Sequence, residues 1–240
     1  MDIATFITNY REAFGAQAPL PLLFAYSDTP LATTGKVGGC FFKQLDTARR
    51  GIPVSLNADN IGCGGGRFYT GFAPMGEHIP TFVSLKERYK QTPDMVLDYT
   101  RQLSIQAAPK AYLNFVRIDQ AESFDGMEGL FFYATPDILS GLCAWAFYDC
   151  NEPDAVCTPF GSGCGTTIAT AVRENRRQGY RTFIGLFDPS VRPYVGADEL
   201  GFVIPASRFR TMYETMRSTC LFGTNAWSKV KARIEPDTAQ

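Results

Sequence analysis

The sequence predicts an α/β or α+β fold in which two αβ repeats, related by a pseudo-two-fold axis, share one core and a partly parallel mixed sheet. Apolar runs typical of strands alternate with amphipathic helical segments along the 240-residue chain. Short motifs of the first half return in the second half in the same order. A hydrophobic content of 45% and a charged content of 20% are those of a globular protein with a proper core.

The predicted repeat depends on four pairs of matching motifs whose separation stays between 124 and 128 residues. The pairs are Gly39-Cys40 with Gly163-Cys164, Arg49-Arg50-Gly51 with Arg176-Arg177-Gln178-Gly179, Arg67-Phe-Tyr69-Thr-Gly71 with Arg192-Pro-Tyr194-Val-Gly196, and Ile79-Pro80 with Ile204-Pro205. We therefore expect a single domain over residues 1–240, with one repeat over about 18–92 and the other over about 110–218.

The individual elements follow from periodicity and from their end signals. Apolar spacing of about 3.6 residues, with Gly15, Gly51 and Gly179 as stops and Thr92-Pro93 as a start, predicts helices. Their ranges are 4–14, 41–50, 81–90, 93–106, 137–148, the segment from Cys164 to Gly179, and 206–218. Apolar runs between turn residues predict strands over 20–26, 52–56, 111–118, 129–134, 181–187 and 202–204. Gly62–Arg67 is expected to be a loop, and the polar tail 235–240 to be frayed.

Three of the seven cysteines are candidate ligands of a metal. Cys40 and Cys164 stand at predicted helix starts, and Cys63 lies in the glycine-rich loop. Free N–H groups and the helix macrodipole favour a thiolate at such a start, and thiolates suit soft metals or redox chemistry. A metal or an iron–sulfur cluster is therefore one candidate cofactor. The alternative is that all three are core residues, as we expect for Cys143, Cys150, Cys157 and Cys220.

Glycines and arginines at two places predict a site for an anionic ligand. Consecutive glycines permit a nest of backbone N–H groups, and an arginine adds a permanent bidentate charge. The candidate residues are Gly64, Gly65, Gly66 and Arg67 in the first half, and Ser162, Gly163, Gly165, Thr166 and Arg192 in the second. The alternative is structural, with glycines that allow close packing and arginines that hold the carbonyl groups of turns.

Composition and motifs also exclude some classes of function. The net charge of −1 and the absence of a basic stripe disfavour a nucleic acid partner. No run approaches the roughly 18 apolar residues of a membrane span, and the first residues do not resemble a signal peptide, so we expect a cytoplasmic protein. His78 is the single histidine, which excludes histidine-rich metal sites. The stretch Gly161–Thr167 lacks the lysine of a P-loop.

Several of these motifs carry a resemblance to a known family. Gly39-Cys40, Ala48-Arg-Arg-Gly51, Gly62-Cys63-Gly-Gly-Gly-Arg67 and Gly201-Phe-Val-Ile-Pro205 resemble, in order and spacing, the prokaryotic "domain of unknown function 169" family over about residues 20–218. The resemblance implies no established activity. It is consistent with a role in binding a metal or cofactor through the cysteines.

The sequence as a whole predicts a protein that binds a small anionic ligand, a metal or a cofactor between its two repeats through the glycine and cysteine segments. Two alternatives stay open: a non-catalytic structural or partner-binding domain, and a thiol-redox enzyme. The absence of a C-x-x-C pair and of a second histidine counts against the redox enzyme. Neither a catalysed reaction nor an oligomeric state follows from the sequence.

Overall fold

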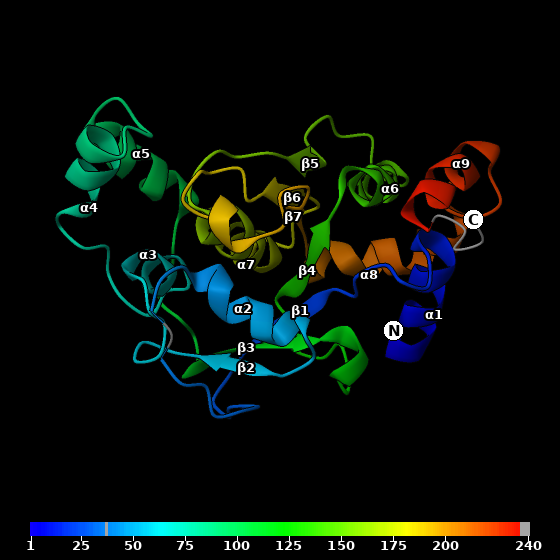
Figure 1. The fold of residues 1–240 in the computed structure, drawn as a ribbon, viewed down its shortest axis with the longest axis horizontal. Coiled ribbons are helices and arrows are strands. Elements are labelled where there is room, and N and C mark those ends of the chain that lie inside the picture. Colours follow the sequence, from blue (N-terminus) through cyan, green and yellow to red (C-terminus); the bar gives the residue numbers. More distant parts are fainter. Residues whose placement is uncertain (37, 236–240) are drawn as a thin grey trace.

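The computed structural model describes residues 1–36 and 38–235, within which seven strands form one sheet in the order β2-β3-β1-β4-β7-β6-β5 (Figure 1). The strands are β1 (Leu22–Ser27), β2 (Val54–Leu56), β3 (Tyr112–Arg117), β4 (Gly129–Ala134), β5 (Val156–Cys157), β6 (Thr182–Gly185) and β7 (Leu200–Pro205). All neighbours pair antiparallel except β5 and β6, which are parallel. The predicted fold class, with its partly parallel mixed sheet, is confirmed. Of the predicted frayed tail, residues 236–240 lie outside the described residues.

Side chains along each strand point alternately to the two faces of the sheet. Each face carries its own layer of buried apolar residues, so both faces are covered. In β4, Leu130 and Phe132 belong to one cluster of buried residues, whereas Phe131 and Tyr133 belong to the other. The antiparallel neighbour β7 alternates in the same way, with Val203 opposite Phe131 in the register. The central strands are therefore buried on both sides, and helices must lie on each face.

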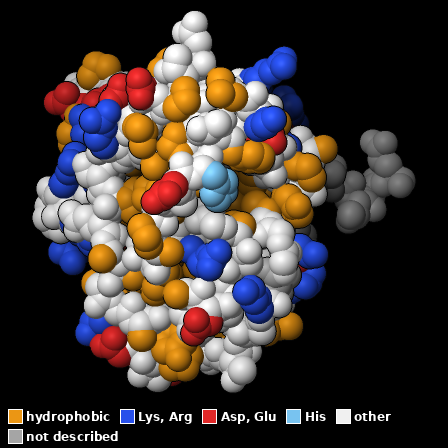
Figure 2. Space-filling model, turned by 90° about the vertical axis from the view of Figure 1, so that its left-hand side faces the viewer, with side chains coloured by type: hydrophobic (Ala, Val, Ile, Leu, Met, Phe, Trp, Pro, Cys, Tyr) orange, Lys and Arg blue, Asp and Glu red, His pale blue; other side chains and the backbone are white. Residues whose placement is uncertain are grey.

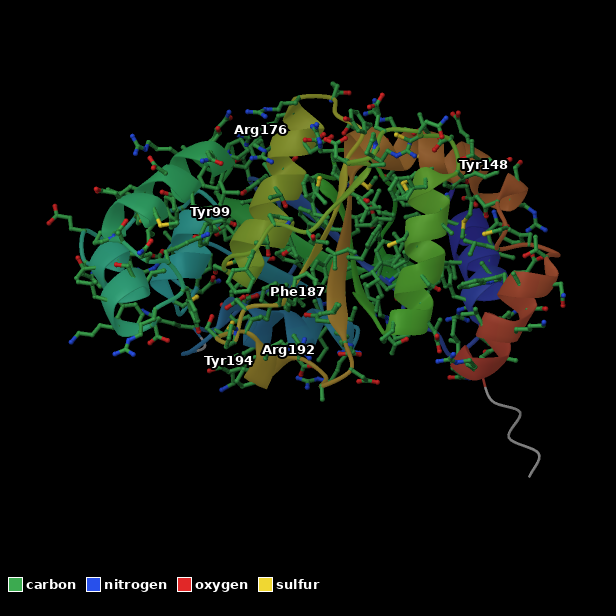
Figure 3. The ribbon with its side chains drawn as sticks, turned by 90° about the horizontal axis from the view of Figure 1, so that it is seen from above. Tyr99, Tyr148, Arg176, Phe187, Arg192 and Tyr194 are labelled. Carbon is green, nitrogen blue, oxygen red and sulfur yellow. The ribbon has the colours of Figure 1, made fainter. Side chains whose placement is uncertain are left out.

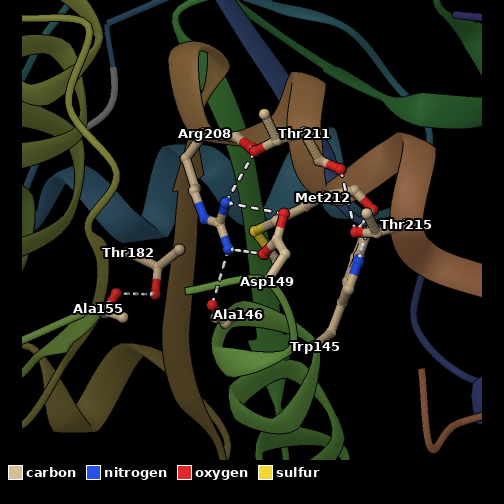
Figure 4. Close-up of polar contacts among 9 residues, drawn as sticks. All are labelled: Trp145, Ala146, Asp149, Ala155, Thr182, Arg208, Thr211, Met212 and Thr215. Atoms are coloured by element: carbon tan, nitrogen blue, oxygen red, sulfur yellow. Dashed lines mark hydrogen bonds and ion pairs between the residues drawn. The ribbon is translucent and has the colours of Figure 1, made fainter. Parts of the chain in front are cut away.

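The first layer consists of the helices α1 (Ile3–Phe14), α6 (Pro136–Phe147), α8 (Ala206–Thr215) and α9 (Asn225–Ile234), which gather on the right in Figure 1. Phe6, Trp145 and Phe209 are fully buried in this layer. Figure 4 shows polar contacts between α8 and the C-terminal end of α6. Arg208 pairs with Asp149 and donates a hydrogen bond to the carbonyl of Ala146 at 2.8 Å. The sequence did not predict α9, nor the short strand β5.

The second layer consists of α2 (Phe41–Arg49) and of a helix that begins with a π-helical turn, Gly165–Ala169, and continues as α7 (Thr170–Arg176). Phe41, Leu45 and Ile168 bury their side chains against the sheet. Cys40 is the N-cap residue of α2, and Cys164 immediately precedes the π-helical turn. The predicted positions of both cysteines at helix starts are confirmed.

A helical segment between β2 and β3 extends beyond the sheet on the left in Figure 1. It contains α3 (Gly64–Tyr69), α4 (Ile79–Thr81), a π-helical turn (Phe82–Lys86) and α5 (Pro93–Leu103). Two predictions are wrong here. The glycines of the expected loop form α3, with Cys63 as N-cap. The helix expected over 81–90 ends at Lys86, and Arg88 adopts a positive φ of 57°, which a helix cannot contain.

The internal repeat is not confirmed and stays a prediction. One matched pair differs in structure, since Ile79-Pro80 lies in helix α4 whereas Ile204-Pro205 ends strand β7. The predicted division also placed the strand over 111–118 in the second repeat, but β3 pairs with β1 and β2 of the first half. The order of strands is nevertheless compatible with a repeat, because β1 and β4 lie together and antiparallel in the middle of the sheet.

Candidate functional site

Three helix starts meet at one cavity of about 420 Å³, and each contributes one of the three predicted cysteines to its wall. Cys40 comes from α2, Cys63 from α3 and Cys164 from the turn before α7. The outer wall belongs to the helical segment between β2 and β3, through Phe82, Val96 and Tyr99 among others. In Figure 3, Tyr99 approaches this region from α5, and Tyr194 lies on the turn that follows β6.

The environment of the cysteines differs from the predicted thiolates. Burial raises the pKa of the Cys40 thiol to about 11, and it raises the pKa of Cys164 further. Cys164 also lies 3.4 Å from the hydroxyl oxygen of Ser162, and Cys63 accepts a hydrogen bond from the backbone N–H of Gly66 at 3.2 Å. Cys40 and Cys164 are therefore protonated at neutral pH, and neither has the low pKa of a redox-active thiol.

The predicted metal site finds no support in this arrangement. Among residues 1–36 and 38–235, no group of three or more histidine, cysteine, aspartate or glutamate side chains is placed to hold a metal ion. Cys40, Cys63 and Cys164 line the same cavity, but as placed they do not form such a group. The same observation leaves the predicted iron–sulfur cluster without support.

The predicted anion-binding residues separate into three groups. Gly65, Gly66, Ser162 and Gly163 line the cysteine-lined cavity. Gly64 and Arg67 line a second cavity, of about 450 Å³, to which Gly65 also contributes. The remaining three residues, Gly165, Thr166 and Arg192, line neither of these two cavities.

Those three residues have structural contacts instead. A Cβ atom on Gly165 would lie 2.7 Å from the ring of Tyr69, and Thr166 is buried against Gly185. The guanidinium of Arg192 donates to four backbone carbonyl groups, those of Leu186, Gly196, Ala197 and Glu199, and so holds the turn between β6 and β7. Arg192 therefore holds the carbonyl groups of a turn, which was the structural alternative to anion binding.

Sequence reasoning missed two polar groups of the cysteine-lined cavity. Asp188 is 2% exposed; its Oδ1 accepts a hydrogen bond from Ser190, and its Oδ2 has no hydrogen-bond partner within the described part of the chain. The hydroxyl of Tyr99 is also buried without a partner there, and burial raises its pKa to about 12. The sequence contained one signal that could have identified Asp188: this acid directly follows the strand predicted over 181–187.

Comparison with known proteins assigns the family. Residues 22–215 match the domain of unknown function 169 (DUF169) family, which is described as uncharacterised ArCR. The chain belongs to the DUF169 family. This confirms the resemblance carried by the glycine, cysteine and arginine motifs. No curated protein and no solved structure shows significant similarity to this DUF169 chain.

One negative finding concerns membranes. No helix in the described ranges combines the length and the apolar character that crossing a membrane requires.

Proposed function

We propose that this DUF169 protein binds a small, largely aromatic molecule that carries a protonated amine, in the cavity lined by Cys40, Cys63 and Cys164. The observation that carries the proposal is the carboxylate of Asp188 in the cavity wall, buried with Oδ2 unpaired. An unsatisfied buried carboxylate oxygen costs about 1–3 kcal/mol or more, and a ligand that donates a hydrogen bond to it recovers that free energy.

The rest of the wall suits the apolar body of such a ligand. Its side chains are mostly aromatic or aliphatic, and among them are Phe41, Phe42, Tyr69, Val96 and Val191. Small-molecule sites commonly combine such a wall with a few fixed polar groups, and a volume of about 420 Å³ admits a bicyclic compound. The neutral thiols of Cys40 and Cys164 add polarizable surface rather than charge.

The charges around the cavity favour a cationic over an anionic ligand. The basic residue of the wall, Lys90, lies over the ring of Tyr99, 5.1 Å from its centroid, and makes no ion pair with Asp188 among residues 1–36 and 38–235. The two arginines predicted to bind an anion do not line this cavity: Arg192 is engaged with backbone carbonyls, and Arg67 lines the second cavity. A positive group on the ligand would therefore complement the unpaired oxygen of Asp188.

The proposal is tested with 2-naphthylmethylamine as the probe and 2-naphthoate as its anionic counterpart. Thermal shift and isothermal titration are expected to show saturable binding of the amine to the wild type, and Asp188→Asn is expected to weaken it about tenfold or more. Glu87→Gln changes an exposed acid that also lines the cavity, and should leave the affinity almost unchanged. Equal binding of the amine and the carboxylate, or an unaffected Asp188→Asn variant, would refute the proposal.

A further inference from the structure

We infer that the second cavity, beside α3 and α4, is a separate binding site for a small organic anion, a carboxylate or a phosphate ester. It has a volume of about 450 Å³ and contains Arg67 and His78 as its basic side chains. Neither aspartate nor glutamate lines it within the described residues. Most of its other walls are apolar, with Phe68, Met75 and Ile79 among them.

Arg67 is the side chain that indicates an anion. Its Nε is buried and has no hydrogen-bond partner within residues 1–36 and 38–235, and Arg67 takes part in none of the ion pairs found there. Two other arginines differ because their guanidinium groups do have partners: Arg208 pairs with Asp149, although its Nε is also unpartnered within the described residues, and Arg192 donates to carbonyl groups. A guanidinium presents a planar set of donors that matches carboxylate or phosphate oxygens in pairs.

His78 adds a second donor on the outer side of the same cavity. It precedes α4 as N-cap residue and is exposed, and its imidazole lies close to Gly76. Figure 2 shows this single histidine near the middle of the face formed by the helical segment, with an acidic side chain directly beside it and hydrophobic side chains around both. A ligand with an apolar body and an anionic group would meet hydrophobic contacts and two donors at this place.

The two cavities are neighbours with opposite charge preference. Both are lined by Gly65, Tyr69 and Ile79, but the wall of the first contains the unpaired carboxylate of Asp188 and that of the second the unpaired guanidinium of Arg67. The anion site does not depend on the proposed amine site. Either can fail in experiment while the other stands.

Benzoate and phenyl phosphate are the probes, and benzyl alcohol is the neutral control. Because His78 is the only histidine of the sequence and lines this cavity but not the first, its imidazole Hε1 resonance is one assignable signal at this site. We expect one or both anions to move this resonance with a saturable dependence on concentration, and benzyl alcohol to leave it in place. Which anion binds more tightly distinguishes a carboxylate from a phosphate ligand.

The variant Arg67→Met retains an apolar stem and removes the charge. It should weaken anion binding about tenfold or more, with folding verified by its melting temperature. Arg210→Ala changes an exposed arginine of α8 and should have no effect on anion binding. Unsaturable shifts, or equal affinity of wild type and Arg67→Met for both anions, would overturn the inference.

Discussion

Ser190 donates its hydroxyl hydrogen to Oδ1 of Asp188, and this single bond orients the carboxylate while Oδ2 stays unpaired in the wall of the cavity. The residues lie on the turn that follows β6, so the sheet fixes their position. Buried carboxylates are rarely left in this state, because desolvation disfavours the charge. This unpaired oxygen is the observation on which the proposed amine site depends.

The first prediction contrasts two aspartates without any ligand. Asp188→Asn removes an incompletely paired buried charge, so it should leave the free energy of unfolding unchanged or raise it. Asp149→Asn removes the partner of Arg208, whose side chain is 5% exposed, and should lower the free energy of unfolding by about 3 kcal/mol. Urea denaturation of the two variants provides the measurement. A marked destabilisation by Asp188→Asn would mean that its carboxylate holds the fold together.

The second prediction concerns thiol reactivity. With its pKa raised from 9.0 to about 11, Cys40 has about 100-fold less thiolate at pH 8 than an unperturbed thiol. Iodoacetamide should therefore alkylate Cys40 far more slowly than the exposed Cys220, and the buried Cys164 more slowly still. Mass spectrometry of peptides after timed labelling measures the three rates. Fast labelling of Cys164 at pH 8 would restore the redox alternative.

The third prediction concerns alkaline pH. Burial raises the pKa of Cys40 and Cys164 in the folded state, so the unfolded chain releases these protons first as the pH rises. The contribution of the two thiols to stability is complete below pH 9.0, the ordinary pKa, and is lost as the pH rises toward about 11 and beyond. The urea midpoint should fall over this range, and a Cys40→Ala, Cys164→Ala variant should show a shallower fall. An equal slope in both proteins would contradict the assignment.

The fourth prediction compares two glycines that the sequence assigned to ligand binding. A Cβ on Gly165 would lie 2.7 Å from the ring of Tyr69, so Gly165→Ala should lower the free energy of unfolding by about 1–3 kcal/mol. A Cβ on Gly64 meets nothing within 4 Å, and Gly64→Ala should raise the stability of α3 by up to about 1 kcal/mol. Thermal denaturation of the two variants distinguishes these effects. Similar melting temperatures would show that Tyr69 can move aside.

The sequence predicted most of the sheet, because its strands carry local signals. Apolar runs between turn residues located β1, β3, β4 and β6, and the start of α2 at Cys40 followed from periodicity. It did not predict α3, since three consecutive glycines have low helix propensity and only tertiary contacts, such as Gly66 against Ile61, make a helix there favourable. The shape of the helical segment between β2 and β3 was likewise set by packing.

The sequence predicted that the three cysteines belong to the candidate site, but it did not predict which charged groups the site contains. The sequence placed Cys40 and Cys164 at helix starts and Cys63 in a glycine-rich loop, and the structure brings all three to one cavity. The raised pKa values of Cys40 and Cys164 could not be read from sequence, because they depend on burial by segments far away in the chain. Arg192 and Arg67 stand in similar motifs. In the described part of the chain, Arg192 donates to backbone carbonyl groups, whereas the buried Nε of Arg67 has no partner.

The central claim is that an aromatic amine occupies the cysteine-lined cavity, and the most direct measurement is protection of its thiols. Alkylation of Cys40, Cys63 and Cys220 is followed by mass spectrometry at pH 8.5 with and without saturating 2-naphthylmethylamine. The amine should slow labelling of Cys40 and Cys63, which line the cavity, and leave the exposed Cys220 unchanged. In Asp188→Asn the protection should be lost. Equal labelling of all three cysteines with and without the amine would contradict the account.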